Sequence, residues 1–236
     1  MSSLIFLALD LVSVPIGIRV GSCVLPHPTP PPPHPAIVFF LLVIYEPLLS
    51  CAKLSADTQD KIQALNAFKL SLHDPLGALT GWEPSTPSAP CDWRGVSCYN
   101  GRVSELRLPR LHLSGALSPQ VANLRMLRKL SLHSNSLNGT IPTSLSKCTL
   151  LNSIFLQYNS FSGTLYPVVS NLTNLLVLNV AGNYLSGEIP GDLPKNLRFI
   201  DLSSNSFSGD IPKNVSSGSQ LLQLINLSYN RISEEH

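Results

Sequence analysis

Leu127-Arg128-Lys129-Leu130-Ser131-Leu132-His133-Ser134-Asn135 is the stretch that decides the fold, because its pattern is written five times along the chain. In each copy, large apolar residues occupy the first, fourth and sixth places, and an asparagine occupies the ninth. The gaps between the five asparagines are 24, 24, 22 and 25 residues. A period in the twenties predicts repeats that stack on one another into a solenoid.

Apolar and polar residues alternate in the middle of each copy, which predicts a half-buried strand. In the first copy, Leu130 and Leu132 are expected to point inward, and Lys129, Ser131 and His133 outward. The amide at the ninth place can both donate to and accept from backbone groups at the bend after the strand. We therefore expect a structural role, rather than ligand binding, for Asn135, Asn159, Asn183, Asn205 and Asn230.

The second half of the period has its own pattern, seen in Leu137-Asn138-Gly139-Thr140-Ile141-Pro142 and again from Leu185 and from Phe207. Over about residues 57–236, the chain resembles the plant-specific leucine-rich repeats of receptor-like kinases, receptor-like proteins and polygalacturonase-inhibiting proteins. The resemblance implies an α/β leucine-rich repeat solenoid, with a curved parallel β-sheet on the concave face and a 3-10 or irregular convex side. The Gly-x-Ile-Pro segment is expected to build a second short sheet.

Some units depart from the repeat. The proline comes one place late at Pro119 and Pro167, and we expect a looser second sheet there because proline removes a donor and fixes φ. The first repeat has Leu111 where asparagine is expected, as terminal repeats are often atypical. Cys148 has no partner in a neighbouring repeat and is expected to be a small buried apolar thiol.

A helix is predicted before the repeats, starting at Asp57-Thr58-Gln59-Asp60 and stopping at His73-Asp74-Pro75. Its apolar stripe is Ile62, Leu65, Phe68 and Leu72. The helix, Leu79-Thr80-Gly81-Trp82 and the segment Cys91 to Cys98 around Trp93 resemble, in that order, the N-terminal cap of plant leucine-rich repeat ectodomains. The resemblance implies a helical cap closed by a disulfide between Cys91 and Cys98.

Four segments are expected. Residues 1–35 form a low-complexity, proline-rich extension, and residues 36–52 a signal peptide, with Leu4 to Val14 as the alternative signal region. Residues 57–100 form the cap, and residues 101–236 a solenoid of about five repeats and a truncated sixth. In that last repeat, Ile225, Leu227 and Ile232 are expected to be partly exposed, which makes the chain marginally stable or prone to aggregation.

Catalysis, metal binding and nucleic-acid binding are not expected. The 16 basic and 14 acidic residues leave a net charge of +2, and the basic residues are scattered rather than gathered on a helix. The six histidines accompany no nucleophile motif or phosphate loop, and CxxC is absent. We expect no enzyme activity, because kinase motifs are missing from this chain, and no cofactor.

Recognition is the function that the pattern favours. Outward strand positions of successive repeats form columns on the concave face, and the middle column is predicted to run Arg107, Ser131, Phe155, Asn179, Asp201, Asn226. Exposed aromatics anchor interfaces, so Phe155, Tyr158 and Phe199 are the sharpest candidates. The whole predicted binding face is Arg107, His133, Phe155, Gln157, Tyr158, Asn179, Phe199 and Asp201. N-glycosylation candidates are Asn138, Asn171, Asn214 and Asn226.

The resemblance implies the truncated ectodomain of a receptor-like kinase, which recognises a protein or peptide ligand and possibly a co-receptor ectodomain. Such a product is extracellular, or lies at the plasma membrane through a missing C-terminal span or an uncleaved signal. A secreted inhibitor of the polygalacturonase-inhibiting type and a short free-standing adaptor are the alternatives.

Overall fold

The structure, a computed structural model, describes residues 57–213 and 221–233. The chain divides into two units, residues 1–56 and residues 57–236, and all described residues belong to the second. The predicted proline-rich extension, the predicted signal peptide and the Asn214 sequon lie outside the described residues. Within those residues, no helix has the length and apolar character needed to cross a membrane.

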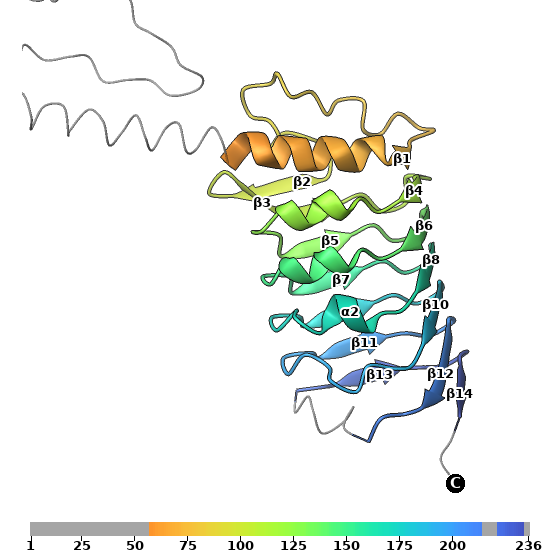
Figure 1. Cartoon of the computed structure of the whole chain (residues 1–236). Helices are drawn as coiled ribbons and strands as arrows, with labels where there is room; N and C mark the ends of the chain where they lie inside the picture. Colours follow the sequence, from red (N-terminus) through yellow and green to blue (C-terminus); the bar gives the residue numbers. More distant parts are fainter. Residues whose placement is uncertain (1–56, 214–220, 234–236) are drawn as a thin grey trace, which may run out of the picture. The chain divides into compact units, whose positions relative to one another are not determined.

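One sheet, here called the first sheet, contains the strands predicted from the nine-residue pattern (Figure 1). All its neighbours pair in parallel except β2 and β3, which form an antiparallel hairpin. The middle residues of its repeat strands are at most 1% exposed from Leu106 through Ile200, which confirms the predicted alternation. In order, the strands are β2 (Val96–Tyr99), β3 (Arg102–Arg107), β5 (Lys129–Ser131), β7 (Ser153–Phe155), β9 (Val177–Asn179), β11 (Phe199–Asp201) and β13 (Leu224–Asn226).

The second sheet is built from the other half of each unit, as predicted. Its first pair, β1 and β4, is antiparallel, and the later pairs are parallel. Its strands, in sheet order, are β1 (Leu72–His73), β4 (Ser114–Ala116), β6 (Ser136–Thr140), β8 (Ser160–Gly163), β10 (Tyr184–Gly187), β12 (Ser206–Asp210) and β14 (Arg231–Ser233).

The late prolines do not loosen this sheet, so that prediction was wrong. β4 and β8 both keep their pairing with β6. Pro119 lies at the start of the 3-10 helix η1 (Pro119–Asn123), and Pro167 lies in the first turn of α2 (Tyr166–Val169). The first turn of a helix leaves its N–H groups without intrahelical partners, so a proline there removes no needed donor.

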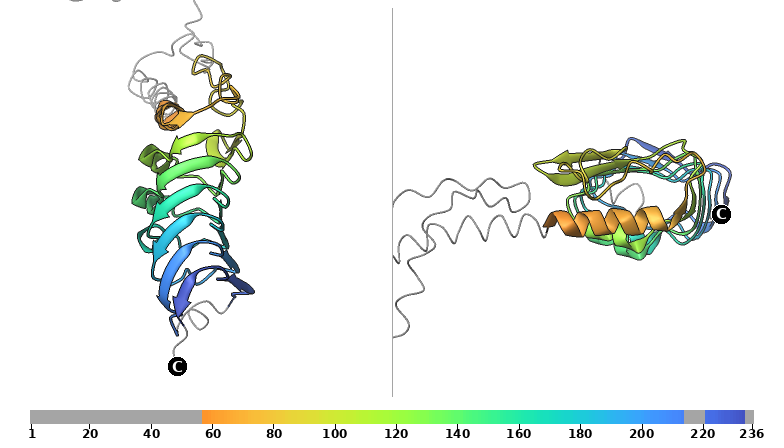
Figure 2. Two further views of the ribbon diagram at one scale, coloured as in Figure 1. Left: turned by 90° about the vertical axis from the view of Figure 1, so that its right-hand side faces the viewer. Right: turned by 90° about the horizontal axis from the view of Figure 1, so that it is seen from above.

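The side of the solenoid opposite the first sheet is helical or irregular (Figure 2). It holds η1, α2 and a second 3-10 helix, η2 (Thr143–Lys147). Cys148 follows η2, is fully buried and forms no disulfide, as predicted. Burial raises the pKa of its thiol to about 11, against a weaker opposing effect of Arg125.

The five asparagines tie each repeat to the one before it. Asn183 is representative: its Oδ1 accepts from the N–H of Phe161 at 2.9 Å, and its Nδ2 donates to the carbonyls of Leu156 at 3.1 Å and Val180 at 2.9 Å. The same set of bonds recurs at Asn135, Asn159, Asn205 and Asn230. The structural role predicted for these asparagines is confirmed.

The residue before each asparagine adopts a left-handed backbone conformation, which the sequence pattern did not indicate. Its φ lies between 54° and 61° at Ser134, Tyr158, Gly182, Ser204 and Tyr229. Arg110, which precedes Leu111 in the first repeat, has a φ of 56°. Non-glycine residues rarely adopt this conformation. It turns the chain out of the first sheet, so that the following asparagine points back between the repeats.

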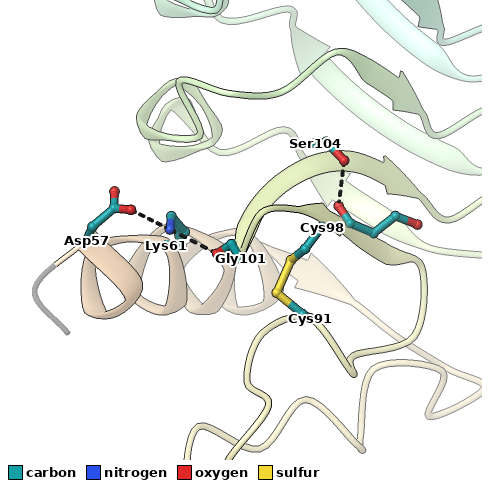
Figure 3. Close-up of a disulfide and its surroundings, with 7 residues drawn as sticks. Asp57, Lys61, Cys91, Cys98, Gly101 and Ser104 are labelled. Carbon is teal, nitrogen blue, oxygen red and sulfur yellow. Dashed lines mark hydrogen bonds and ion pairs between the residues drawn. A yellow bond between two sulfur atoms is a disulfide. The ribbon is translucent and has the colours of Figure 1, made fainter. Parts of the chain in front are cut away.

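The cap covers the first repeat with a helix (residues 57–70) and a set of stacked aromatic rings. Trp82 stacks between Phe68 and Trp93, with ring centroids 6.1 and 5.2 Å apart. The predicted Cys91–Cys98 disulfide is present (Figure 3). Gly95 lies so close to the carbonyl of Arg107 that a Cβ there would come within 2.3 Å of its oxygen.

Lys61 fixes the cap helix to the β2–β3 hairpin. It is only 6% exposed, and its ammonium donates to Asp57 Oδ2 at 2.6 Å and to the carbonyl of Gly101 at 3.2 Å (Figure 3). The predicted extent of the helix was wrong by one turn. Helical structure ends at residue 70, and Leu72 lies instead in β1, because Leu72 and His73 pair with Gly115 and Ser114.

The last repeat is less covered than the others. Ile225 is 38% exposed although its equivalents in the preceding strands are buried, and Leu227 and Ile232 are half-buried. The partial exposure predicted for these three residues is confirmed.

The hydrogen bonds of the five repeat asparagines, here called the asparagine ladder, lead to a prediction about stability. Asn183→Ala removes four hydrogen bonds and leaves the buried N–H of Phe161 without its acceptor, so we expect a loss of about 3 kcal/mol in the free energy of unfolding. Asn196→Ala, which removes one exposed bond to the carbonyl of Thr173, should lose at most about 1 kcal/mol. Urea unfolding measures both, and equal losses are incompatible with a ladder that carries stability.

The buried thiol makes a chemical prediction. Because thiolate is the reactive form, and burial both raises the thiol pKa and blocks access, iodoacetamide at pH 8 should leave Cys148 unmodified in the folded chain. The same reagent should modify it fully in urea. Peptide mass spectrometry of the Cys148 peptide reads both states, and labelling of the folded chain at the unfolded rate contradicts the prediction.

Candidate recognition face

What we call the recognition face consists of the outward-facing residues of β3, β5, β7, β9, β11 and β13, the residue before each of β5 to β13, and the second and third residues after each strand. Strand pairing aligns the predicted middle column in full: Arg107 with Ser131, Ser131 with Phe155, Phe155 with Asn179, Asn179 with Asp201, and Asp201 with Asn226. The column beside it runs Glu105, Lys129, Ser153, Val177, Phe199, Leu224. The structure therefore brings residues from six repeats onto one continuous surface.

An apolar and aromatic zone lies on the part of this face built by the later repeats. Phe199 is 41% exposed and Leu224 is 50% exposed, and they follow the half-buried Val177 in one column. Phe155 is half-buried in the next column, and the ammonium of Lys129 lies 5.2 Å from its ring centroid. Apolar side chains left in water in neighbouring positions are favourable contacts for a partner.

Tyr158 is held flat at the edge of the face. Its left-handed backbone places the ring against Gly182, where an added Cβ would come within 2.8 Å of Tyr158 Cδ1. The tyrosine is nevertheless 65% exposed. A glycine at position 182 therefore lets a large aromatic ring lie along the surface with one side in solvent.

Three polar members of the middle column make local bonds. The side-chain oxygen Oδ1 of Asn179 accepts from the N–H of Ala181, and those of Asp201 and Asn226 accept from the N–H and hydroxyl of the serine two residues on. These bonds shape the bend after each strand, so these oxygens are already engaged. Gln157 differs, because its buried Oε1 has no hydrogen-bond partner in the described structure.

Basic side chains gather over β3 and β5. Arg107 pairs with Glu105 on the same strand, Lys129 projects over Phe155, and Arg128 is exposed just before β5. Arg110 follows β3 and has a left-handed backbone, as do the equivalent residues of the later repeats. The predicted binding face included Arg107 from this group but not Arg110, Arg128 or Lys129, although their spacing from the repeat asparagines already indicated their columns.

His133 lies in this basic part of the face. Burial lowers the pKa of its imidazole below 6.5, and the positive charge of Arg110 lowers it further. Its Nδ1 is 3.2 Å from the hydroxyl of Ser134. The backbone N–H of Arg110 donates to the carbonyl of His133 at 3.1 Å, so the two residues are neighbours in adjacent repeats.

The sequons lie on different faces. Asn138 is exposed on β6 of the second sheet, and Asn171 is exposed shortly after α2. Asn226 lies at the end of β13 on the recognition face. The described residues contain no group of three histidine, cysteine, aspartate or glutamate side chains able to hold a metal ion.

The electrostatics of the face are testable at His133. Arg110→Ala should raise the pKa of His133, because it removes a nearby positive charge, yet leave it below 6.5, because burial is the larger cause. Lys147→Ala, on the helical side, should leave the pKa unchanged. NMR titration of the imidazole measures all three proteins, and an unshifted pKa in Arg110→Ala places the two side chains too far apart to interact.

Comparisons with known proteins agree with this architecture. Residues 58–99 match the leucine rich repeat N-terminal domain, and residues 126–148, 174–195 and 196–217 match the Leucine Rich Repeat family. The MDIS1-interacting receptor like kinase 1 of Arabidopsis thaliana is 38% identical over 158 residues, which cover 66% of this chain. The chain spans only 15% of the length of that relative.

Two solved structures extend the comparison. The BIR2 ectodomain from Arabidopsis thaliana is 31% identical with a TM-score of 0.64, over 73% of this chain and 93% of that one. The Arabidopsis receptor kinase HAESA, solved with the peptide hormone IDA and the co-receptor SERK1, is 33% identical with a TM-score of 0.68, over 74% of this chain and 30% of that one. With its capped solenoid and its two sheets, this chain belongs to the family of plant leucine-rich repeat receptor kinase ectodomains.

Proposed function

We propose that this chain recognises a peptide or a partner ectodomain through the recognition face, as part of a cell-surface receptor. The observation that carries the proposal is the continuity of that face through six aligned strands with Phe155, Phe199 and Leu224 in neighbouring columns. HAESA, which has the same fold, was solved with both a peptide hormone and a co-receptor. Signalling is not assigned to this chain, because the receptor kinases that it resembles are much longer.

An extracellular setting is part of the proposal. The Cys91–Cys98 disulfide supports it, because disulfides persist in oxidising compartments. The exposure of Asn138 and Asn171 supports glycosylation at both sequons, away from the recognition face. On this proposal, residues 36–52 direct secretion, residues 57–100 cap the solenoid and residues 101–236 form it.

The proposal is tested by selecting peptides that bind the full chain and then changing the face. Phe155→Ala and Phe199→Ala should each lower the affinity for a selected peptide at least tenfold, because truncating a central aromatic side chain at an interface commonly costs about 2 kcal/mol of binding free energy. Tyr166→Ala is the matched control, since Tyr166 is 50% exposed on the helical side. Isothermal titration calorimetry measures each affinity.

Two results oppose the proposal. One is a set of selected peptides whose affinity is unchanged by both phenylalanine substitutions. The other is an affinity that falls with Tyr166→Ala instead, which places binding on the helical side.

A further inference from the structure

The recognition face changes character along the solenoid. Over β3 and β5 it carries Arg107, Arg110, Arg128 and Lys129, with Glu105 as the acidic side chain of these two strands. From β7 to β13 its columns carry Phe155, Val177, Phe199 and Leu224 instead. The charged residues of that later part are Arg198, just before β11, and Asp201, which are of opposite sign. One end of the face is therefore basic and the other is apolar.

The basic end retains its charge in the folded chain. Glu105 pairs with Arg107, and Arg110, Arg128 and Lys129 form no ion pair within the described residues. The ammonium of Lys129 lies over the ring of Phe155, and in that position it can still pair with a carboxylate of a ligand. Burial is the larger cause of the lowered pKa of His133, and the positive charge of Arg110 adds to it. Four cations against one carboxylate favour an acidic ligand.

The dimensions of the face favour an extended ligand. Neighbouring strands of a sheet lie about 4.8 Å apart, so the five intervals from β3 to β13 span on the order of 25 Å. An extended peptide advances about 3.4 Å per residue and crosses that distance in roughly seven residues. A single short segment can therefore contact the basic and the apolar ends at once.

We propose that the ligand is an extended peptide segment with acidic side chains at one end and apolar side chains at the other, lying across the strands with its acidic end over β3 and β5 and its apolar end over β7 to β13. This inference rests on the proposed function, because it names the chemistry and the direction of the ligand of the same face. Like charge repels a basic segment from the first half of the face, and the apolar half holds the other end by burial.

The probe is a random library of twelve-residue peptides, selected separately against the full wild-type chain and against Arg110→Glu/Lys129→Glu. The wild-type chain should enrich peptides with aspartate and glutamate clustered at one end. Their affinity should fall at least tenfold in the charge-reversed variant and fall with rising salt. The variant itself should enrich lysine and arginine at that end.

Arg125→Glu/Lys147→Glu is the matched control, because it reverses two exposed charges on the helical side. It should select the same acidic peptides as the wild-type chain. A photocrosslinker then gives the direction: at the acidic end it should attach within residues 105–133, and at the apolar end within residues 153–229.

The outcomes separate the two proposals. Two outcomes overturn this inference and leave the proposed function standing. In both, the selected peptides lose affinity for Phe199→Ala. In the first they show no enrichment of acidic residues, and in the second their crosslinks run in the reverse direction. Peptides whose binding is unchanged by Phe155→Ala and Phe199→Ala, or a library that yields no binder, overturn the proposed function and this inference with it.

Discussion

The hydrogen bonds of the repeat asparagines are the constraint on which the rest of the structure depends. The carbonyl of Leu132 accepts from Asn135 of its own repeat and from Asn159 of the next, and the carbonyls of Leu156, Val180 and Leu202 are shared in the same way. Each amide thus satisfies backbone groups of two repeats at once. Buried backbone groups need such partners, so the amides fix both the spacing and the register of the stack.

The asparagine bonds fix the part of each repeat next to the first sheet, and they leave the length and structure of the helical side free to vary. The unit between Asn183 and Asn205 has 22 residues and keeps the asparagine bonds, although its residues 188–198 are irregular, with one bend and one turn, instead of a helix. The units between Asn135 and Asn183 have 24 residues each and accommodate η2 and α2. Changes of length therefore appear on the helical side, while the first sheet and its columns stay in register.

Because the fold is held by inward leucines and by the ladder, the outward side chains of the first sheet carry little of its stability. That freedom explains how neighbouring repeats place residues as different as Lys129, Phe155 and Asn179 in adjacent outward positions. The fold therefore does not require the gradient from basic to apolar side chains along the face, which leaves these positions free to serve the proposed binding. A partner that meets both ends must be matched in charge at one and in apolar surface at the other.

Much of the fold could be predicted from the sequence because the period assigns every residue to a place. The period predicted the alternation of buried and outward residues around Leu130, the columns through Phe155 and Phe199, and the structural role of the asparagines. Contacts from outside the repeat could not be predicted: β1 ends the cap helix before Leu72, since Leu72 pairs with Gly115. Ser131 was expected to face outward, and the small side chain is only 6% exposed between its larger neighbours. The basic side chains over β3 and β5 were not all predicted as part of the binding face, because exposed aromatic side chains were expected to anchor the interface.

The most direct measurement is hydroxyl-radical footprinting of the full chain, alone and with a saturating selected peptide. Binding on the recognition face predicts protection of Phe155, Tyr158 and Phe199 from oxidation, with Tyr166 on α2 oxidised at the same rate in both samples. Protection of Tyr166 with unchanged oxidation of Phe155 and Phe199 contradicts that account, because it places the ligand on the helical side of the solenoid.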